Sequence, residues 1–112
     1  MNAQFRKGVL ELCVLSLIIE KDCYGYELVE CISDHIDITE GTVYPILRRL
    51  TKDQLCESYL KESQEGPPRK YYKITTLGLS VYKKQLEEWL EFNNSIRDLL
   101  KIGTYNDKKT VS

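Results

Sequence analysis

The chain has 112 residues, of which 42% are hydrophobic and 29% are charged, and its formal net charge at pH 7 is −1. This length predicts one domain with one modest hydrophobic core. The nearly neutral total argues against a strongly basic binder of nucleic acid or membranes. No stretch reaches the ~18 consecutive apolar residues of a membrane span.

The N-terminal segment predicts a helix over residues 5–21 that is apolar around much more than one stripe. Its apolar positions are Val9, Leu10, Leu12, Cys13, Leu15, Leu17, Ile18 and Ile19. Such a helix is buried on most sides, so we expect part of it to contact another chain. Charged residues 20–22 follow directly, where a signal peptide would have small residues. We therefore expect no signal peptide and a cytoplasmic protein.

Two shorter helices follow a break at residues 22–25. The first is predicted over 24–35, because Leu28, Cys31 and Ile32 have an amphipathic spacing. The second is predicted over 40–53, with the hydroxyl of Thr39 capping its first turn. The apolar face of this third helix consists of Val43, Ile46, Leu47 and Leu50. Pro45 removes one backbone donor, which a helix tolerates only near its first turns.

Two strands are predicted next, over residues 56–62 and 69–75, and both are rich in tyrosine and in alternating polar residues. Residues 63–68 between them are typical of a turn, so the pair predicts a β-hairpin. A helix, a short turn, a helix and then a hairpin follow the order of a winged helix-turn-helix. The fold class is therefore mainly α with a small β-hairpin.

A long final helix is predicted from a cap at Thr76 to near Gly103. It carries a 3.5-residue repeat formed by Leu79, Tyr82, Leu86, Trp89, Asn93, Ile96 and Leu100. That repeat is typical of a coiled-coil seam, and ~25 residues span ~40 Å. One small domain cannot cover such a seam, so we expect a homodimer. The expected organisation is a DNA-binding domain over 1–75, a dimerisation helix over 76–103 and a disordered tail over 104–112.

The net charge of −1 conceals an uneven distribution of charge along the chain. Residues 1–40 carry a net charge of −5, residues 41–86 carry +5 and residues 87–112 carry −1. The basic block covers the third helix and the hairpin. A basic segment within a neutral protein indicates an electrostatic contact with nucleic acid, although it can also be an ordinary solvated face.

Catalysis and metal binding lack support in the sequence. No two of the four cysteines form a CxxC pair, and His35 is the only histidine. We expect reduced thiols, with a thiol-based redox sensor as the alternative. No glycine-rich phosphate loop, nucleophile–histidine pair or catalytic carboxylate pair is recognisable. The sequence therefore predicts no enzyme, no cofactor and no metal site.

Three ordered motifs resemble the PadR family of bacterial transcription regulators. They are GYEL at 25–28, TEGTVYPILRRL at 39–50 and RKYYKITTLG at 69–78. The resemblance covers residues 5–100, and the single long C-terminal helix is similar to that of the small PadR subgroup. It implies a homodimeric repressor of its own gene and of a neighbouring transporter or stress gene, which binds an inverted-repeat operator in double-stranded DNA and is released by a small-molecule effector.

The resemblance also implies which residues contact DNA. The third helix would be the recognition helix in the major groove. Of two neighbouring arginines we prefer Arg48 over Arg49, because Arg48 lies four residues after Tyr44 on the same face. The expected DNA-binding residues are Tyr26, Thr39, Gly41, Thr42, Tyr44, Arg48, Arg69 and Lys70. Acidic Glu40, Glu62 and Glu65 near this face would weaken phosphate binding or reject wrong sequences.

Trp89 has two interpretations. It lies on the seam, where it would pack in the dimer, and its position is similar to that of a tryptophan in a multidrug-sensing member of the family. The second interpretation implies a planar aromatic effector bound between two indole rings. The dimer or effector pocket would consist of Leu86, Trp89, Asn93 and Ile96. The alternative function for the whole chain is a winged-helix protein–protein adaptor that has lost DNA binding.

Overall fold

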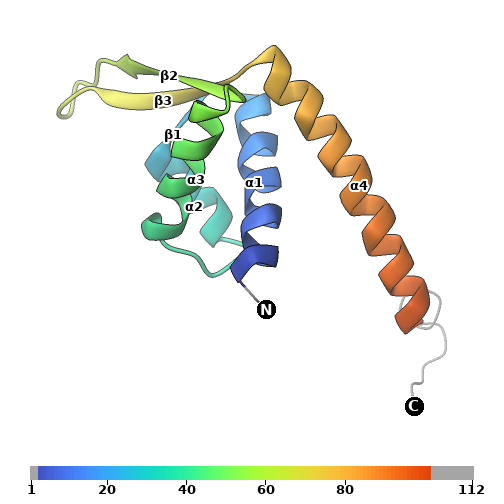
Figure 1. Ribbon diagram of the computed structural model, residues 1–112. Coiled ribbons are helices and arrows are strands. Elements are labelled where there is room, and N and C mark those ends of the chain that lie inside the picture. The colour runs from blue at the N-terminus through green and yellow to red at the C-terminus, as the bar shows by residue number, and fades with distance from the viewer. Residues whose placement is uncertain (1–2, 102–112) are drawn as a thin grey trace. The chain divides into compact units, whose positions relative to one another are not determined.

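The computed structural model describes residues 3–101, with side chains from Lys7 onward, and contains four helices and three strands in that range (Figure 1). They are α1 (Ala3–Glu20), β1 (Cys23–Tyr24), α2 (Gly25–Ser33), α3 (Glu40–Lys52), β2 (Cys56–Lys61), β3 (Arg69–Ile74) and α4 (Thr76–Leu100). Contacts divide the chain into two compact units, with the boundary between Tyr82 and Lys83 within α4. Within 3–101, no helix has the length and apolar character to cross a bilayer. The tail expected over 104–112 and the helix end near Gly103 lie outside the described residues.

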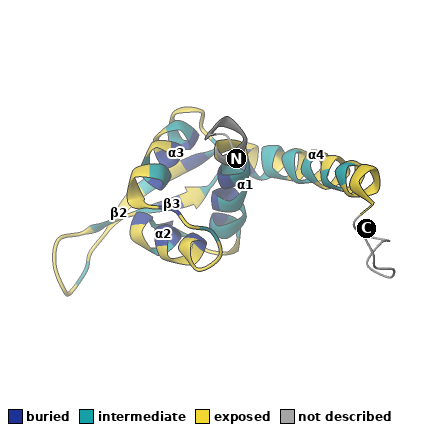
Figure 2. Cartoon of the chain, turned by 90° about the horizontal axis from the view of Figure 1, so that it is seen from below, coloured by how far each residue is buried: buried dark blue, intermediate teal, exposed yellow. Residues whose placement is uncertain are grey.

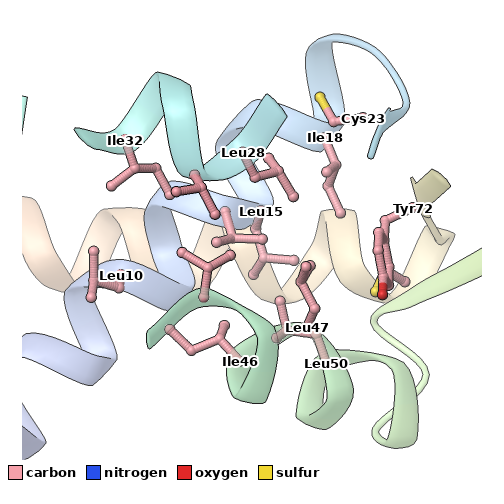
Figure 3. Close-up of a cluster of buried hydrophobic side chains, with 14 of the residues drawn as sticks. Leu10, Leu15, Ile18, Cys23, Leu28, Ile32, Ile46, Leu47, Leu50 and Tyr72 are labelled. Carbon is pink, nitrogen blue, oxygen red and sulfur yellow. The ribbon is translucent and has the colours of Figure 1, made fainter. Parts of the chain in front are cut away.

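Helices α1, α2 and α3 surround one hydrophobic core (Figure 3). The face predicted for α3 is buried completely. Helix α2 differs from the prediction, because Leu28, Val29 and Ile32 form its buried side whereas Cys31 is exposed. Residues 28, 29 and 32 lie on one side of a helix, and residue 31 is turned away from the buried Val29 by about 200°. Helix α2 also ends at Ser33, two residues before the predicted end.

The hairpin belongs to a three-stranded antiparallel sheet with the strand order β1-β3-β2. Strands β2 and β3 confirm the predicted hairpin, each ending one residue early. The predicted break at 22–25 was wrong in part, because Cys23 and Tyr24 pair with Tyr72 and Tyr71 of β3. A two-residue strand is too short to carry an alternating pattern, so only its pairing with β3 reveals it.

The starts of α2 and α3 are held by backbone and carboxylate groups. The predicted hydroxyl cap at Thr39 was wrong: the Thr39 side chain makes no capping hydrogen bond. Its carbonyl oxygen instead accepts from the amide of Thr42 at 3.0 Å. At α2 the carboxylate of Glu27 accepts from the amide of Tyr24 at 3.0 Å. This satisfies one of the amides that every helix start leaves without a partner.

Helix α4 begins at a tight junction with the segment between α3 and β2. The cap is Thr75 and not the predicted Thr76: the Thr75 hydroxyl accepts from the amide of Gly78 at 2.9 Å and donates to the carbonyl of Gln54 at 2.8 Å. The Thr75 amide also donates to the carbonyl of Leu55 at 3.2 Å. A Cβ atom on Gly78 would lie 2.0 Å from that same Leu55 oxygen. The junction therefore requires glycine at position 78.

We expect Gly78→Ala to destabilise the fold by about 1–3 kcal/mol, because the added methyl group cannot fit without moving backbone. Urea unfolding followed by circular dichroism measures the loss. Gly8→Ala in α1 is the control, since a Cβ atom there meets nothing within 4 Å. Equal unfolding midpoints for the two variants would contradict the tight junction.

Candidate nucleic-acid interface

The face of α3 opposite the core is exposed, and exposed residues recur along the helix between buried ones (Figure 2). Gly41, Pro45, Arg48 and Lys52 lie as a strip along this face, at intervals of four, three and four residues. This is the spacing of neighbours on one side of a helix. The strip ends in two cations at its C-terminal half and carries no large side chain at its N-terminal half.

The two neighbouring arginines of α3 have different environments. Arg49 forms an ion pair with Glu11 of α1 and is half-buried. Arg48 is exposed on the outer strip. Arg49 therefore connects two helices of the core, and Arg48 is the arginine whose guanidinium is accessible to a ligand.

Tyr44 lies at the edge of the strip and packs on the first residue of α2. A Cβ atom on Gly25 would lie 2.4 Å from the Tyr44 ring, so glycine is required for this contact. Burial raises the pKa of Tyr44, and the nearby Glu40 carboxylate raises it further. Tyr44 thus remains a neutral phenol that holds α3 against α2. Tyr26, on the exposed side of α2, is 48% accessible.

The two consecutive basic residues at the start of β3 in the wing, the hairpin β2–β3, lie on opposite faces of the sheet. Successive strand residues alternate in direction, so Arg69 and Lys70 cannot form one basic pair. The Arg69 guanidinium lies 4.6 Å from the centre of the Tyr24 ring and 3.9 Å from the Glu65 carboxylate. Lys70 is exposed and lies opposite Leu60, which is 69% accessible.

A row of three tyrosines crosses the face of the sheet that carries Arg69. Tyr71 lies between Tyr24 and Tyr59, with ring centres 5.4 Å and 5.8 Å away. The ammonium of Lys61 lies 5.1 Å from the Tyr71 ring. Tyr59 donates a hydrogen bond of 2.6 Å to Asp22, and this bond raises its pKa to about 12. Sequence reasoning missed this row, whose only signal is the alternation in β2 and β3.

The residues expected at the dimer or effector pocket lie on one stretch of α4. Leu86, Trp89, Asn93 and Ile96 are half-buried. On the same stretch the apolar side chains of Leu90 and Phe92 are 46% and 55% accessible.

The thiols show no arrangement that would hold a metal ion. Among the described residues, no group of three His, Cys, Asp or Glu side chains is placed for it. All four cysteines are free: Cys31 is exposed, Cys13 is half-buried, and Cys23 and Cys56 are buried. Burial raises the pKa of the Cys23 thiol to about 11 and also raises that of Cys56.

Three helices, a wing and an exposed third helix define a winged helix-turn-helix protein. Residues 14–84 match the model of the transcriptional regulator PadR-like family, and the chain belongs to this family. It is therefore a DNA-binding transcription regulator and not an enzyme.

Individual relatives agree with the family. A PadR-like transcriptional regulator from Bacillus cereus is 40% identical, covers 88% of this chain and 97% of its own, and has a TM-score of 0.79. A PadR family regulator from Eggerthella lenta is 35% identical, covers 88% of both chains and has a TM-score of 0.77. An uncharacterised protein of Lysinibacillus sphaericus is 38% identical over 94 residues, which are 80% of this chain and 86% of its own.

The order of thiol reactivity follows from burial and pKa. We expect Cys31 to react first with a disulfide reagent such as DTNB at pH 8, because it is exposed. Cys23 and Cys56 should react only as the protein opens, because burial and a raised pKa both reduce the accessible thiolate. Absorbance at 412 nm measures the phases, and Cys31→Ser should remove the fast one. A fast phase that persists in Cys31→Ser would contradict this assignment.

Proposed function

We propose that the chain is a cytoplasmic homodimeric repressor that binds an inverted-repeat operator and is released by a small-molecule effector. Residues 1–75 would bind DNA and residues 76–103 would join the two copies. The observation that carries the proposal is the exposed strip of α3, which presents Arg48 and Lys52 beside a basic wing. Family membership favours this function over the adaptor considered from the sequence.

In the proposed complex, α3 enters the major groove with its N-terminal half toward the bases. Gly41 and Thr42 would lie closest to the base edges, and Arg48 would contact a base or a phosphate one turn further along. Thr39 and Tyr26 would contact the flanking phosphates. Such backbone contacts position the protein, and base contacts specify the sequence.

Arg69 and Lys70 take different parts in this proposal. Lys70 is exposed, so it is available to neutralise a phosphate. Arg69 is occupied by the ring of Tyr24 and by the Glu65 carboxylate. Arg69 would therefore position the wing, and Lys70 would contact the DNA.

A gel-shift titration over a range of salt concentrations tests both points. The probe is the duplex upstream of the gene that encodes the chain. We expect specific retention that weakens steeply with salt, and Lys70→Ala should reduce the salt slope by about one. Adding Arg69→Ala should change the slope no further, and Lys7→Ala, at an exposed position of α1, is the control.

Two outcomes would oppose these proposals. Absence of retention at low salt would reject the repressor in favour of the adaptor. A slope that falls by a second unit when Arg69→Ala is added would show that Arg69 contacts phosphate directly.

The dimer is proposed from the apolar residues of α4. The seam of Leu86, Trp89 and Ile96 has a coiled-coil spacing, and Asn93 is the one polar position that can determine its register. Exposed Leu90 and Phe92 add apolar surface to the same stretch. A second copy of α4 is the simplest partner for this surface. An effector that binds one spacing of the two copies more tightly would shift the population away from the DNA-binding state.

Trp89 is the only tryptophan, so its fluorescence reports on the proposed effector pocket without interference. We expect planar aromatic cations to quench it at tens of micromolar and to release DNA over the same range, because two indole rings attract such ligands. In Trp89→Phe the release should require more ligand, while DNA binding without ligand stays intact. Full fluorescence at these concentrations would reject the effector and leave the dimer proposal unaffected.

A further inference from the structure

Two of the glycines in the winged-helix unit are required by contacts within the chain. The Tyr44 ring occupies the place of a Cβ atom at Gly25, and the Leu55 carbonyl occupies it at Gly78. At both positions any other residue would displace neighbouring atoms. Contacts within the protein therefore explain why glycine occupies these two positions.

Gly41 is different, because no contact within the described part of the chain requires glycine there. A Cβ atom built there would meet only the Thr39 hydroxyl, at an ordinary contact distance of 3.5 Å. Its φ lies outside the positive range that favours glycine. Glycine is among the least favourable residues in a helix, and an exposed position in α3 would gain stability from alanine.

Pro45 is a second residue that the helix by itself disfavours. It lies inside α3, is exposed, and follows Gly41 by four residues on the same face. Because proline has no amide N–H, it cannot make the helical hydrogen bond to the carbonyl of Gly41. The two residues together leave a smooth strip, with a backbone acceptor that has lost its usual donor.

The groups at this end of the strip are hydrogen-bond acceptors. Glu40, the neighbour of Gly41, is exposed and adds a carboxylate at the same end of α3. A carboxylate repels phosphate but accepts from the amino groups that cytosine and adenine present in the major groove. The cations Arg48 and Lys52 lie further along, toward the other end of the helix.

From these observations we infer that Gly41 and Pro45 mark the point where α3 touches the base edges. The inference rests on the proposed function and specifies its chemistry. The missing side chain at Gly41 allows the groove to approach the backbone, and the Gly41 carbonyl accepts from an exocyclic amino group of cytosine or adenine. The Pro45 ring lies against the neighbouring base edge. A single contact with the DNA bases thereby explains why α3 carries both Gly41 and Pro45, each of which lowers the stability of the helix.

The first test compares Gly41→Ala with the matched control Gly8→Ala, both at exposed helical positions where a Cβ atom fits. Each should raise the melting temperature, because alanine favours a helix. The probe is a duplex that the wild-type dimer selects from a random pool. Gly41→Ala should weaken its binding at least tenfold, whereas Gly8→Ala should leave it unchanged.

The second test uses Pro45→Ala, which returns an N–H donor to the Gly41 carbonyl. Affinity for the selected duplex should fall about tenfold, whereas affinity for a scrambled duplex of the same length should not change. Equal losses on both duplexes would remove the base-reading role. Wild-type affinity in Gly41→Ala, or a lowered melting temperature, would overturn the close approach.

Failure of the wild-type dimer to select any duplex would be a different result, because it would reject the proposed function itself. The experiment therefore begins with the selection of a duplex by the wild-type protein, before any variant is compared. Selection by the wild type together with unchanged binding by Gly41→Ala would reject only the inference about Gly41 and Pro45.

Discussion

The burial of one apolar face of α3 is the constraint on which the rest of the interface depends. Val43, Ile46, Leu47 and Leu50 are almost completely inaccessible, so the rotation of α3 about its axis is determined by the core. Two contacts at its flanks support that rotation: the Tyr44 ring packs on Gly25, and Arg49 pairs with Glu11. Rotation by one residue, about 100°, would remove Arg48 from the outer strip and expose core residues. The direction in which α3 presents its polar side is therefore a consequence of packing.

Packing within the fold also explains why counting charges along the chain is a coarse guide to the interface. The basic block at residues 41–86 contains nine lysines and arginines, but several of them already have partners inside the fold. Arg49 is paired with Glu11, and Arg69 and Lys61 lie over tyrosine rings. The exposed cations of α3 and the wing that lie outside these contacts are Arg48, Lys52, Lys70 and Lys73, which are fewer than the nine in the block. A cation that holds an aromatic ring or a carboxylate stabilises the scaffold and is less available to a phosphate.

The junction at the start of α4 connects three parts of the winged-helix unit. The Leu55 carbonyl follows the end of α3, accepts from the amide of Thr75 after β3, and lies against Gly78 in α4. Gln54 adopts a φ of 62° just before it, and its carbonyl accepts from the Thr75 hydroxyl. A non-glycine residue in this conformation carries a local cost that the surrounding hydrogen bonds offset. The first turn of α4 is thus part of the same unit as the wing, in accordance with a unit boundary after Tyr82.

The sequence by itself determined the four helices, the hairpin and the winged-helix class. The reason is that the spacing of apolar residues within a short segment indicates whether that segment is a helix or a strand. It also separated the basic block from the acidic first third. Only the tertiary structure decided the contacts between residues distant in sequence: the pairing of Cys23 and Tyr24 with β3, and the glycine requirements at Gly25 and Gly78. It likewise decided that the Arg69 guanidinium lies over the Tyr24 ring, and that Thr75 caps α4 in place of Thr76. These features depend on how separate elements meet, and no pattern within one element encodes the shape of its partner.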